Sequence, residues 1–174
     1  LGMPGGKFEV NLDALPEERF TLTGMDRIEF LVATNPSQNP KPLTKIVSGG
    51  ELSRISLAIQ VITAQRDGVP CLIFDEVDVG IGGRVAEIVG QKLRELGLTR
   101  QVLCITHLPQ VAAQGHHHLQ VVKTTKQNNA LTQVKPLTPE KRNEEIARML
   151  GGIEITDQTR AHAQEMIERA QQNT

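Results

Sequence analysis

Residues 47–54 read Val47-Ser48-Gly49-Gly50-Glu51-Leu52-Ser53-Arg54, and this stretch decides how the flanking sequence is interpreted. A serine and two glycines end a loop, and apolar residues at helical spacing follow at Leu52, Ile55, Ile59 and Ile62. Glycine lets a ligand approach the backbone closely, and the first amides of a helix are unpaired donors at its positive end. The stretch therefore predicts a phosphate-facing turn, although an ordinary Ser-capped helix fits the same residues.

The length and composition of the chain restrict its class. At 174 residues we expect one domain, residues 1–174, with a strand and loop lead-in over 1–46 and a lobe over 47–174. A net charge of −1 gives no overall attraction to nucleic acid or anionic membrane, so any DNA contact would need a local patch. Four Phe, no Tyr and no Trp do not favour stacking platforms for single-stranded bases.

Several features bear on where the chain works. No apolar run approaches the ~20 residues of a membrane span, and the N-terminus lacks a signal-peptide pattern. Cys71 and Cys104 lie in apolar, strand-like runs and are interpreted as small buried residues in a reducing cytosol. Because the sequence begins at Leu1 without a Met, we expect it to be part of a longer protein.

The lead-in is expected to form short strands and turns. Strand-like patterns occupy residues 7–10 and 27–32, residues 20–22 form a candidate third strand, and residues 35–42 are rich in Pro, Asn and Ser and predict a loop. The stretch Gly5-Gly6-Lys7 does not match a Walker A loop, because that motif needs a further Gly and a following Ser or Thr where Leu1 and Phe8 stand.

The next informative stretch is Cys71-Leu72-Ile73-Phe74-Asp75-Glu76, in which four apolar residues, starting with the cysteine, lead into two carboxylates. A continuous apolar run predicts a strand buried on both faces of a parallel sheet, and ligands bind at the C-terminal ends of such strands. Because successive side chains point to opposite sides, Asp75 and Glu76 can do different jobs, one holding a metal and one addressing a water. A strand that ends in solvated acids is the alternative.

A second helix and a second buried strand follow. The glycines of residues 77–83 are not a dinucleotide loop, because Val85 stands where that motif needs Gly. Apolar spacing predicts a helix from residue 81 that ends near Gly97, and residues 101–105 predict another buried strand, which is followed by Thr106 and His107. At the same sheet edge as the two acids, His107 becomes a candidate phosphate contact, whereas a purely structural histidine is the alternative.

The C-terminal part predicts a hairpin and two helices. Residues 119–124 and 131–134 could pair as a hairpin, and residues 140–150 and 157–170 are helical, the second helix capped by Thr156. Residues 116–118 are three histidines, but strand alternation would split them between two faces and no partner ligand stands at metal spacing. The sequence therefore assigns them no metal. A mildly basic group is interpreted as a solvated face: Lys123, Lys126, Lys135, Lys141 and Arg142.

Taken in this order, the serine–glycine helix start, the strand ending in Asp-Glu and the strand ending in Thr-His resemble the signature motif, Walker B motif and switch histidine of ABC-type ATPases. The Gly-Gly-Glu form and Asp75-Glu76-Val77-Asp78 resemble the SMC/Rad50 branch more than the transporters. Residues 47–54, 74–81 and 105–112 resemble the RecN family of bacterial DNA repair proteins still more closely. Residues 26–35 and 148–152 do so as well, and the resemblance covers nearly the whole chain.

The resemblance implies an α/β fold, namely the C-terminal lobe of an ABC-type P-loop NTPase head. That lobe has a largely parallel sheet flanked by helices, with short antiparallel strands at the N-terminus. In the family, an N-terminal lobe with Walker A and a coiled coil precede this segment. Three departures from the general ABC pattern stand out: Val47 replaces the usual Leu, and both Walker A and the lobe with the Q-loop glutamine are missing.

The resemblance also implies that two heads bind two ATP molecules between them, with Mg²⁺. On that model Ser48, Gly49 and Gly50 donate hydrogen bonds to the γ-phosphate across the interface. The resemblance also counts Glu51 and Asp78 among the nucleotide-binding residues. Glu51 orients the signature turn, and Asp78 lies in the loop that crosses the dimer seam. The partners implied are the protein's own N-terminal lobe and coiled coil, a second head, and double-stranded DNA in the bacterial cytoplasm.

The catalytic residues implied by the resemblance are Glu76 and His107, and the implied metal residue is Asp75. Asp75 would help to hold Mg²⁺, through water, Glu76 would act as general base on the attacking water, and His107 would contact the γ-phosphate. We expect this segment without Walker A to be inactive by itself. Two other readings fit parts of the sequence: a transporter-type ATPase subunit and a non-catalytic α/β interaction module.

Overall fold

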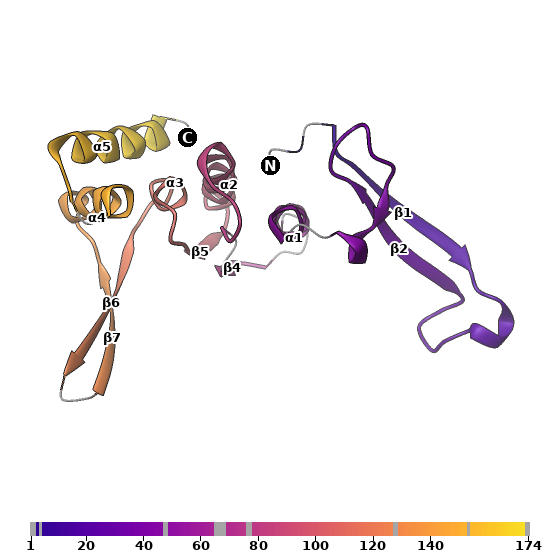
Figure 1. Ribbon diagram of the computed structural model, residues 1–174. Helices are drawn as coiled ribbons and strands as arrows, with labels where there is room; N and C mark the ends of the chain where they lie inside the picture. The colour runs from indigo at the N-terminus through magenta and orange to yellow at the C-terminus, as the bar shows by residue number, and fades with distance from the viewer. Residues whose placement is uncertain are drawn as a thin grey trace. The chain divides into compact units, whose positions relative to one another are not determined.

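The computed structural model describes residues 3, 5–46, 49–64, 69–75, 78–126, 129–152 and 154–172. The chain divides into two compact units, residues 1–58 and 59–174, and each is described by itself. Figure 1 shows the order of the helices and strands along the chain. Two predicted site residues, Ser48 and Glu76, lie outside the described residues.

The first unit contains an antiparallel sheet in the order β1-β2-β3, formed by Lys7–Ala14, Asp26–Ala33 and Lys41–Pro42. The two predicted strands are confirmed, and each extends beyond its predicted bounds. The register pairs Phe8 with Val32 and Val10 with Phe30. Because side chains alternate along a strand, these apolar residues share one face of the sheet. Two short 3-10 helices, η1 (Glu17–Arg19) and η2 (Leu43–Lys45), lie in the connections.

The predicted strand over residues 20–22 is wrong. Thr21 and Gly24 exchange both backbone hydrogen bonds, at 3.1 and 3.2 Å, and close a tight turn. Gly24 has a φ of +143°, which a residue with a side chain rarely adopts. The chain reverses here, so its third strand is supplied by β3 instead.

The predicted first helix is confirmed as α1, Gly49–Ala64. Ile55 and Leu57 are buried in it, with 6% and 2% of their surfaces exposed. The other members of the predicted apolar stripe remain exposed: Leu52, Ile59 and Ile62.

In the second unit, β4 (Cys71–Asp75) and β5 (Gln101–Ile105) form a parallel pair. The connection between them contains α2, Gly83–Leu96, which ends at Gly97 as predicted and contacts β5. The apolar face of α2 is buried at Ala86, Val89, Gly90, Leu93 and Leu96. The α/β class is thus confirmed, with the parallel pairing at β4 and β5.

The prediction that these strands are buried on both faces is wrong for the chain as described. Phe74 points to one face and is only 3% exposed, whereas Ile73, Leu103 and Ile105 share the other face and are 68%, 44% and 52% exposed. Cys71 is also exposed, contrary to prediction, and Cys104 is half-buried. Helix α2 contacts β5, and one face of the pair is left uncovered by the residues that the structure describes.

The rest of the second unit contains the short helix α3 (Pro109–Ala112), the hairpin β6–β7 (Leu119–Lys126 and Asn129–Pro136), α4 (Pro139–Gly151) and α5 (Asp157–Gln172). The predicted hairpin and both predicted helices are confirmed. The Thr156 cap is confirmed too, since its hydroxyl accepts from the Thr159 amide at 3.2 Å.

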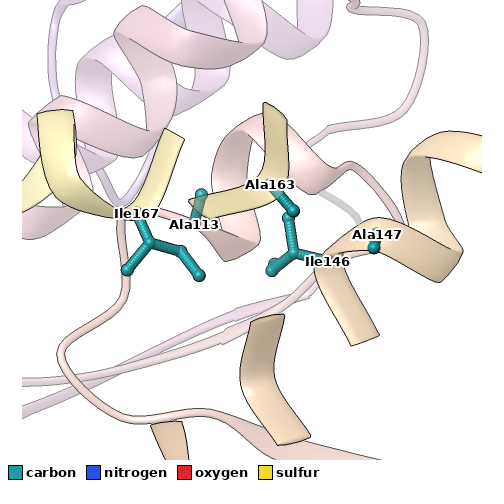
Figure 2. Close-up of a cluster of buried hydrophobic side chains, with 5 residues drawn as sticks. All are labelled: Ala113, Ile146, Ala147, Ala163 and Ile167. Atoms are coloured by element: carbon teal, nitrogen blue, oxygen red, sulfur yellow. The ribbon is translucent and has the colours of Figure 1, made fainter. Parts of the chain in front are cut away.

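A small apolar core joins α3, α4 and α5. Figure 2 shows the side chains of Ile146 and Ile167 gathered with three alanines, Ala113, Ala147 and Ala163. Alanines at these contacts let the helices approach closely, because they add little side-chain volume. Among the described residues, no helix is long and apolar enough to cross a membrane.

Candidate functional site

The carboxyl ends of β4 and β5 lie side by side. Asp75 is the last residue of β4, and its register partner is Ile105, the last residue of β5. Thr106 and His107 follow β5 directly, so they lie at the same edge of the sheet as Asp75. Ligands bind at this edge of open α/β sheets. The side chain of Asp75 is exposed and therefore accessible there.

Asp78, three positions after the strand, points inward. Its residue is only 1% exposed. The carboxylate oxygen Oδ2 accepts a short hydrogen bond from the Thr106 hydroxyl and a second one, of 3.0 Å, from the His107 amide. Hydrogen bonds of this kind allow a carboxylate to be buried, because they replace its lost water.

His107 is held at its backbone and faces solvent with its ring. Its imidazole Nδ1 lies 3.3 Å from Asp78 Oδ2, while 69% of the side chain is exposed. The Thr106 hydroxyl also accepts from the Leu108 amide at 3.0 Å, which fixes the turn of the chain at this point. With Nδ1 directed at the carboxylate, Nε2 is available to a ligand at the sheet edge.

The segment between Asp78 and α2 is a tight turn. The Ile81 amide donates to the Asp78 carbonyl at 3.3 Å, and Gly80 has a φ of +73°. Val79 and Gly80 are exposed. The middle of the turn, Val79 and Gly80, is therefore exposed to solvent, whereas the side chain of Asp78 at its start is buried.

The carboxylates of Asp78 and Asp75 lie close enough to the Cys104 thiol to affect its pKa. Burial raises the pKa of this thiol from 9.0 to about 11, and the negative charges of Asp78 and Asp75 add to the increase. Desolvation and neighbouring carboxylates both disfavour a thiolate. The same charges favour a cation at this end of β4 and β5.

The chain after His107 is fixed by close packing and by two arginines. Gly90 of α2 lies so close to α3 that an added Cβ would stand 2.7 Å from Gln114 Cγ and 3.1 Å from Val111 Cα. The guanidinium of Arg94 donates to the Gln114 carbonyl at 2.8 Å, and that of Arg142 donates to the Gly115 carbonyl at 2.6 Å. Helices α2 and α4 thereby hold the segment that continues from the candidate switch.

Asp75, Asp78 and His107 are thus brought to one edge of the second unit. Gly49 and Gly50 start α1 in the first unit, and Glu51, partly buried, is in its first turn. The residues that the structure describes contain no group of three or more metal-ligating side chains. An exposed carboxylate such as Asp75 suits Mg²⁺, which is held through one or two carboxylates and keeps several of its waters.

Thr106 is the contact that sequence reasoning missed. The sequence places it directly before the candidate switch histidine, but a hydroxyl at the end of a strand is an unspecific signal. Its partner is 28 positions away, so the hydrogen bond to Asp78 becomes visible only in the folded chain.

Comparison with known proteins identifies the family. No protein-family model matches the chain. The chain is 51% identical, over 172 residues and 99% of its length, to the DNA repair protein RecN of Xylella fastidiosa strain 9a5c. The chain belongs to the RecN family. It is also 58% identical over 144 residues to RecN of Vibrio cholerae, and 46% identical over 154 residues to RecN of Bacillus subtilis. The chain spans 31%, 26% and 27% of these three RecN proteins.

Solved structures support the fold of this RecN-family segment. A chain from work on ATP-driven dimerization and DNA-stimulated activation of SMC ATPases matches with a TM-score of 0.61 and 19% identity, over 84% of this chain and 83% of that one. The Smc head domain of Pyrococcus yayanosii, solved with a coiled coil and joint, matches with a TM-score of 0.65 and 22% identity, over 83% of this chain and 26% of that one. The chain therefore has the fold of part of an SMC head.

Proposed function

We propose that this chain is the C-terminal ATPase lobe of a RecN-family protein that acts in DNA double-strand break repair and recombination. In this proposal ATP is bound between two heads, and its hydrolysis drives their engagement and release. One observation carries it: β4 and β5 are neighbouring parallel strands, β4 ends in Asp75 and β5 is followed directly by Thr106-His107, within a chain that matches RecN proteins over nearly its full length. This pairing favours an ATPase over a non-catalytic module.

In the proposal, this chain supplies only part of the nucleotide site, and a further lobe completes it. The chain spans less than a third of the RecN proteins it matches first. We infer that an N-terminal lobe with Walker A, connected through a coiled coil, packs against the open face of β4 and β5. The exposure of Ile73, Leu103 and Ile105 on that face supports this arrangement, because apolar side chains on a sheet are normally covered.

The start of α1 would act on the nucleotide of the opposite head. Ser48, Gly49 and Gly50 would donate hydrogen bonds to the γ-phosphate, through the backbone amides at the helix start and through the Ser48 hydroxyl. Preorganised donors of this kind stabilise the charge of a transferring phosphoryl group. Glu51 would orient the turn, and the exposed turn after Asp78 would lie at the seam between the heads.

At the sheet edge, each side chain would have its own task. Bound Mg²⁺ would neutralise phosphate charge and align the phosphates for attack. Asp75 would hold the ion through water, Glu76 would take a proton from the attacking water as general base, and His107 would contact the γ-phosphate through Nε2. The negative charges of Asp75 and Asp78, which add to the effect of burial on the pKa of Cys104, support the cation.

The remaining partners follow from the family. Double-stranded DNA, at ends or breaks, would be bound by the complete protein in the bacterial cytoplasm at the nucleoid. A transporter-type subunit is not favoured, because the similar proteins are RecN proteins and SMC heads.

Glu76→Gln in the complete protein tests the proposal. Loss of a positioned base should slow ATP hydrolysis at least ~100-fold while ATP binding, measured by equilibrium dialysis, is retained. Glu87→Gln is the matched control, since Glu87 is exposed on α2, and turnover should not change. Turnover near the wild-type rate in Glu76→Gln would remove Glu76 from its role. Ser48→Arg should block ATP-dependent pairing of heads but not nucleotide binding; pairing that survives would refute the cross-interface site.

A further inference from the structure

The β6–β7 hairpin is a two-stranded ribbon that is exposed over most of its described length. Figure 1 shows its two strands extending away from α4. Val121 and Val134 are 58% and 60% exposed, and Lys123 and Lys135 are exposed as well. A ribbon of two strands is marginally stable by itself in water. The hairpin therefore needs a firm base, and its outer part is available to a partner.

The base of the hairpin is fixed to α4. The Leu137 amide donates to the His118 carbonyl at 3.0 Å and closes the ribbon. The side-chain amide of Gln120 donates to Glu145 Oε2 at 2.7 Å. Arg148 holds the same carboxylate through two nitrogens, at 2.9 and 2.7 Å. The hairpin thus leaves the second unit from an anchored start, which limits the orientations that its outer part can take.

The hairpin lies in a stretch of sequence without acids. No Asp or Glu occurs at positions 101–139, although the chain contains 20 of them. Glu145, the acid that contacts the hairpin, is 9% exposed and is paired with Arg148, so it does not oppose an anion there. The hairpin itself carries three lysines, Lys123, Lys126 and Lys135. A protein with a net charge of −1 therefore has a locally positive ribbon.

The register spaces these cations along the ribbon. Lys135 pairs with Gln120, and Lys123 and Lys126 follow at intervals of three positions along β6. At about 3.4 Å per residue, neighbouring lysines are about 10 Å apart along the ribbon. Because side chains alternate along a strand, Lys135 and Lys123 lie on opposite faces of the ribbon. Each face therefore presents a cation.

Uncharged hydrogen-bonding side chains accompany both lysines. Gln133 is exposed on the same face as Lys135, since it lies two positions away on the same strand. Thr132 is exposed and is the register partner of Lys123 on the other face. Lys, Gln and Thr are common donors to the phosphate oxygens of DNA. The major groove of a duplex, about 12 Å wide, admits a two-stranded ribbon.

We propose that the β6–β7 hairpin is a contact of this segment with duplex DNA, lying edge-on in the major groove with Lys123 toward one phosphate backbone and Lys135 toward the other. The inference rests on the proposed function, which supplies double-stranded DNA as the partner. Phosphate contacts carry no sequence information, so this contact is independent of base sequence. Arg142, although basic, is not part of it, because its guanidinium donates to the carbonyls of Ala113 and Gly115.

The test measures binding of the complete protein to a short blunt-ended duplex by fluorescence anisotropy, at several salt concentrations and with the same nucleotide present throughout. Each phosphate contact adds about 0.9 to the slope of log affinity against log salt. Lys123→Gln combined with Lys135→Gln should therefore lower the slope by about 1.8 and weaken binding about 60-fold at about 0.1 M salt. Lys92→Gln combined with Arg169→Gln is the matched control. It removes the same charge from exposed positions of α2 and α5 and should leave both values close to those of the wild type.

Lysine footprinting places the contact without any substitution. Acetylation of the complete protein, followed by mass spectrometry, should modify Lys123 and Lys135 readily in the absence of DNA and poorly when the duplex is saturating. Lys92 should be modified equally in both samples, since it lies outside the hairpin. Protection of Lys123 and Lys135 in the absence of DNA would show that another part of the protein covers the hairpin, and would overturn the inference.

The remaining outcomes separate the inference from the proposed function. Normal duplex binding with an unchanged slope in the hairpin variant would overturn the inference and leave the proposed function intact. Equal losses in the hairpin variant and the control would show a general effect of charge and would also overturn it. A loss confined to single-stranded DNA would show that a duplex is the wrong partner. Absence of duplex binding by the wild-type protein would instead refute the DNA partner in the proposed function, and the inference would fall with it.

Discussion

Substitution of the open face of β4 and β5 should have an effect that depends on how much of the protein is present. We consider Ile73→Thr combined with Leu103→Thr, which places β-branched side chains at both positions but removes apolar surface. Full burial of an Ile or Leu side chain contributes about 1.5–3 kcal/mol. Ile73 still exposes 68% and Leu103 44% of its surface. Completing their burial is therefore worth about 1–2 and about 0.7–1.3 kcal/mol, respectively, or about 2–3 kcal/mol together.

In the complete protein, where an N-terminal lobe is proposed to cover this face, the double substitution should lower the free energy of opening of β4 and β5 by about 2–3 kcal/mol more than it does in the 174-residue chain. In the 174-residue chain the cost is limited to the part of each side chain that is already buried there. Native-state hydrogen exchange of the β4 and β5 amides measures both values.

Phe74→Ala is the matched control, because Phe74 lies on the buried face of the same strand with 3% exposed. It should cost about 3–5 kcal/mol in both proteins. Equal costs of the double substitution in the two proteins would show that no further lobe covers the open face. The proposed position of the N-terminal lobe would then be wrong, whereas the residues at the sheet edge would not be affected.

Two further predictions concern packing and pH. Gly90→Ala should destabilise the chain by about 2 kcal/mol in urea unfolding, because the added Cβ would meet the backbone of α3 at 3.1 Å. Gly82→Ala is the control and should cost less than about 1 kcal/mol, because no atom lies within 4 Å of the added Cβ. Equal costs of the two substitutions would refute the close packing at Gly90. The thiol of Cys104 has a pKa raised to about 11, so iodoacetamide should modify it appreciably only above about pH 10, with the exposed Cys71 as internal reference. The unfolded chain loses the thiol proton first, near pH 9.0, so the free energy of unfolding should fall as the pH rises from 9.0 to 11. Rapid labelling of Cys104 at about pH 8 in the folded chain would contradict the raised pKa.

Local patterns were sufficient to predict most elements. The run 101–105 is an apolar strand bounded by polar residues, and the structure has β5 over the same residues. The helices at 140–150 and 157–170 carry their own start and stop signals, and both were confirmed within a few residues. Residues 20–22 show the limit of such patterns, because β-rich residues in a tight turn satisfy their hydrogen bonds locally.

The sequence by itself determined the order of strands and helices, the polar residues that end β4 and β5, and the resemblance to one family, because periodicity, turn residues and motifs are properties of short stretches. Only the tertiary structure decided that Asp78 turns inward to Thr106 and His107, and that one face of the parallel pair remains open. The physical reason is the same in both cases. Burial and hydrogen-bond partners depend on which distant segments meet, and a stretch of sequence does not contain its partner.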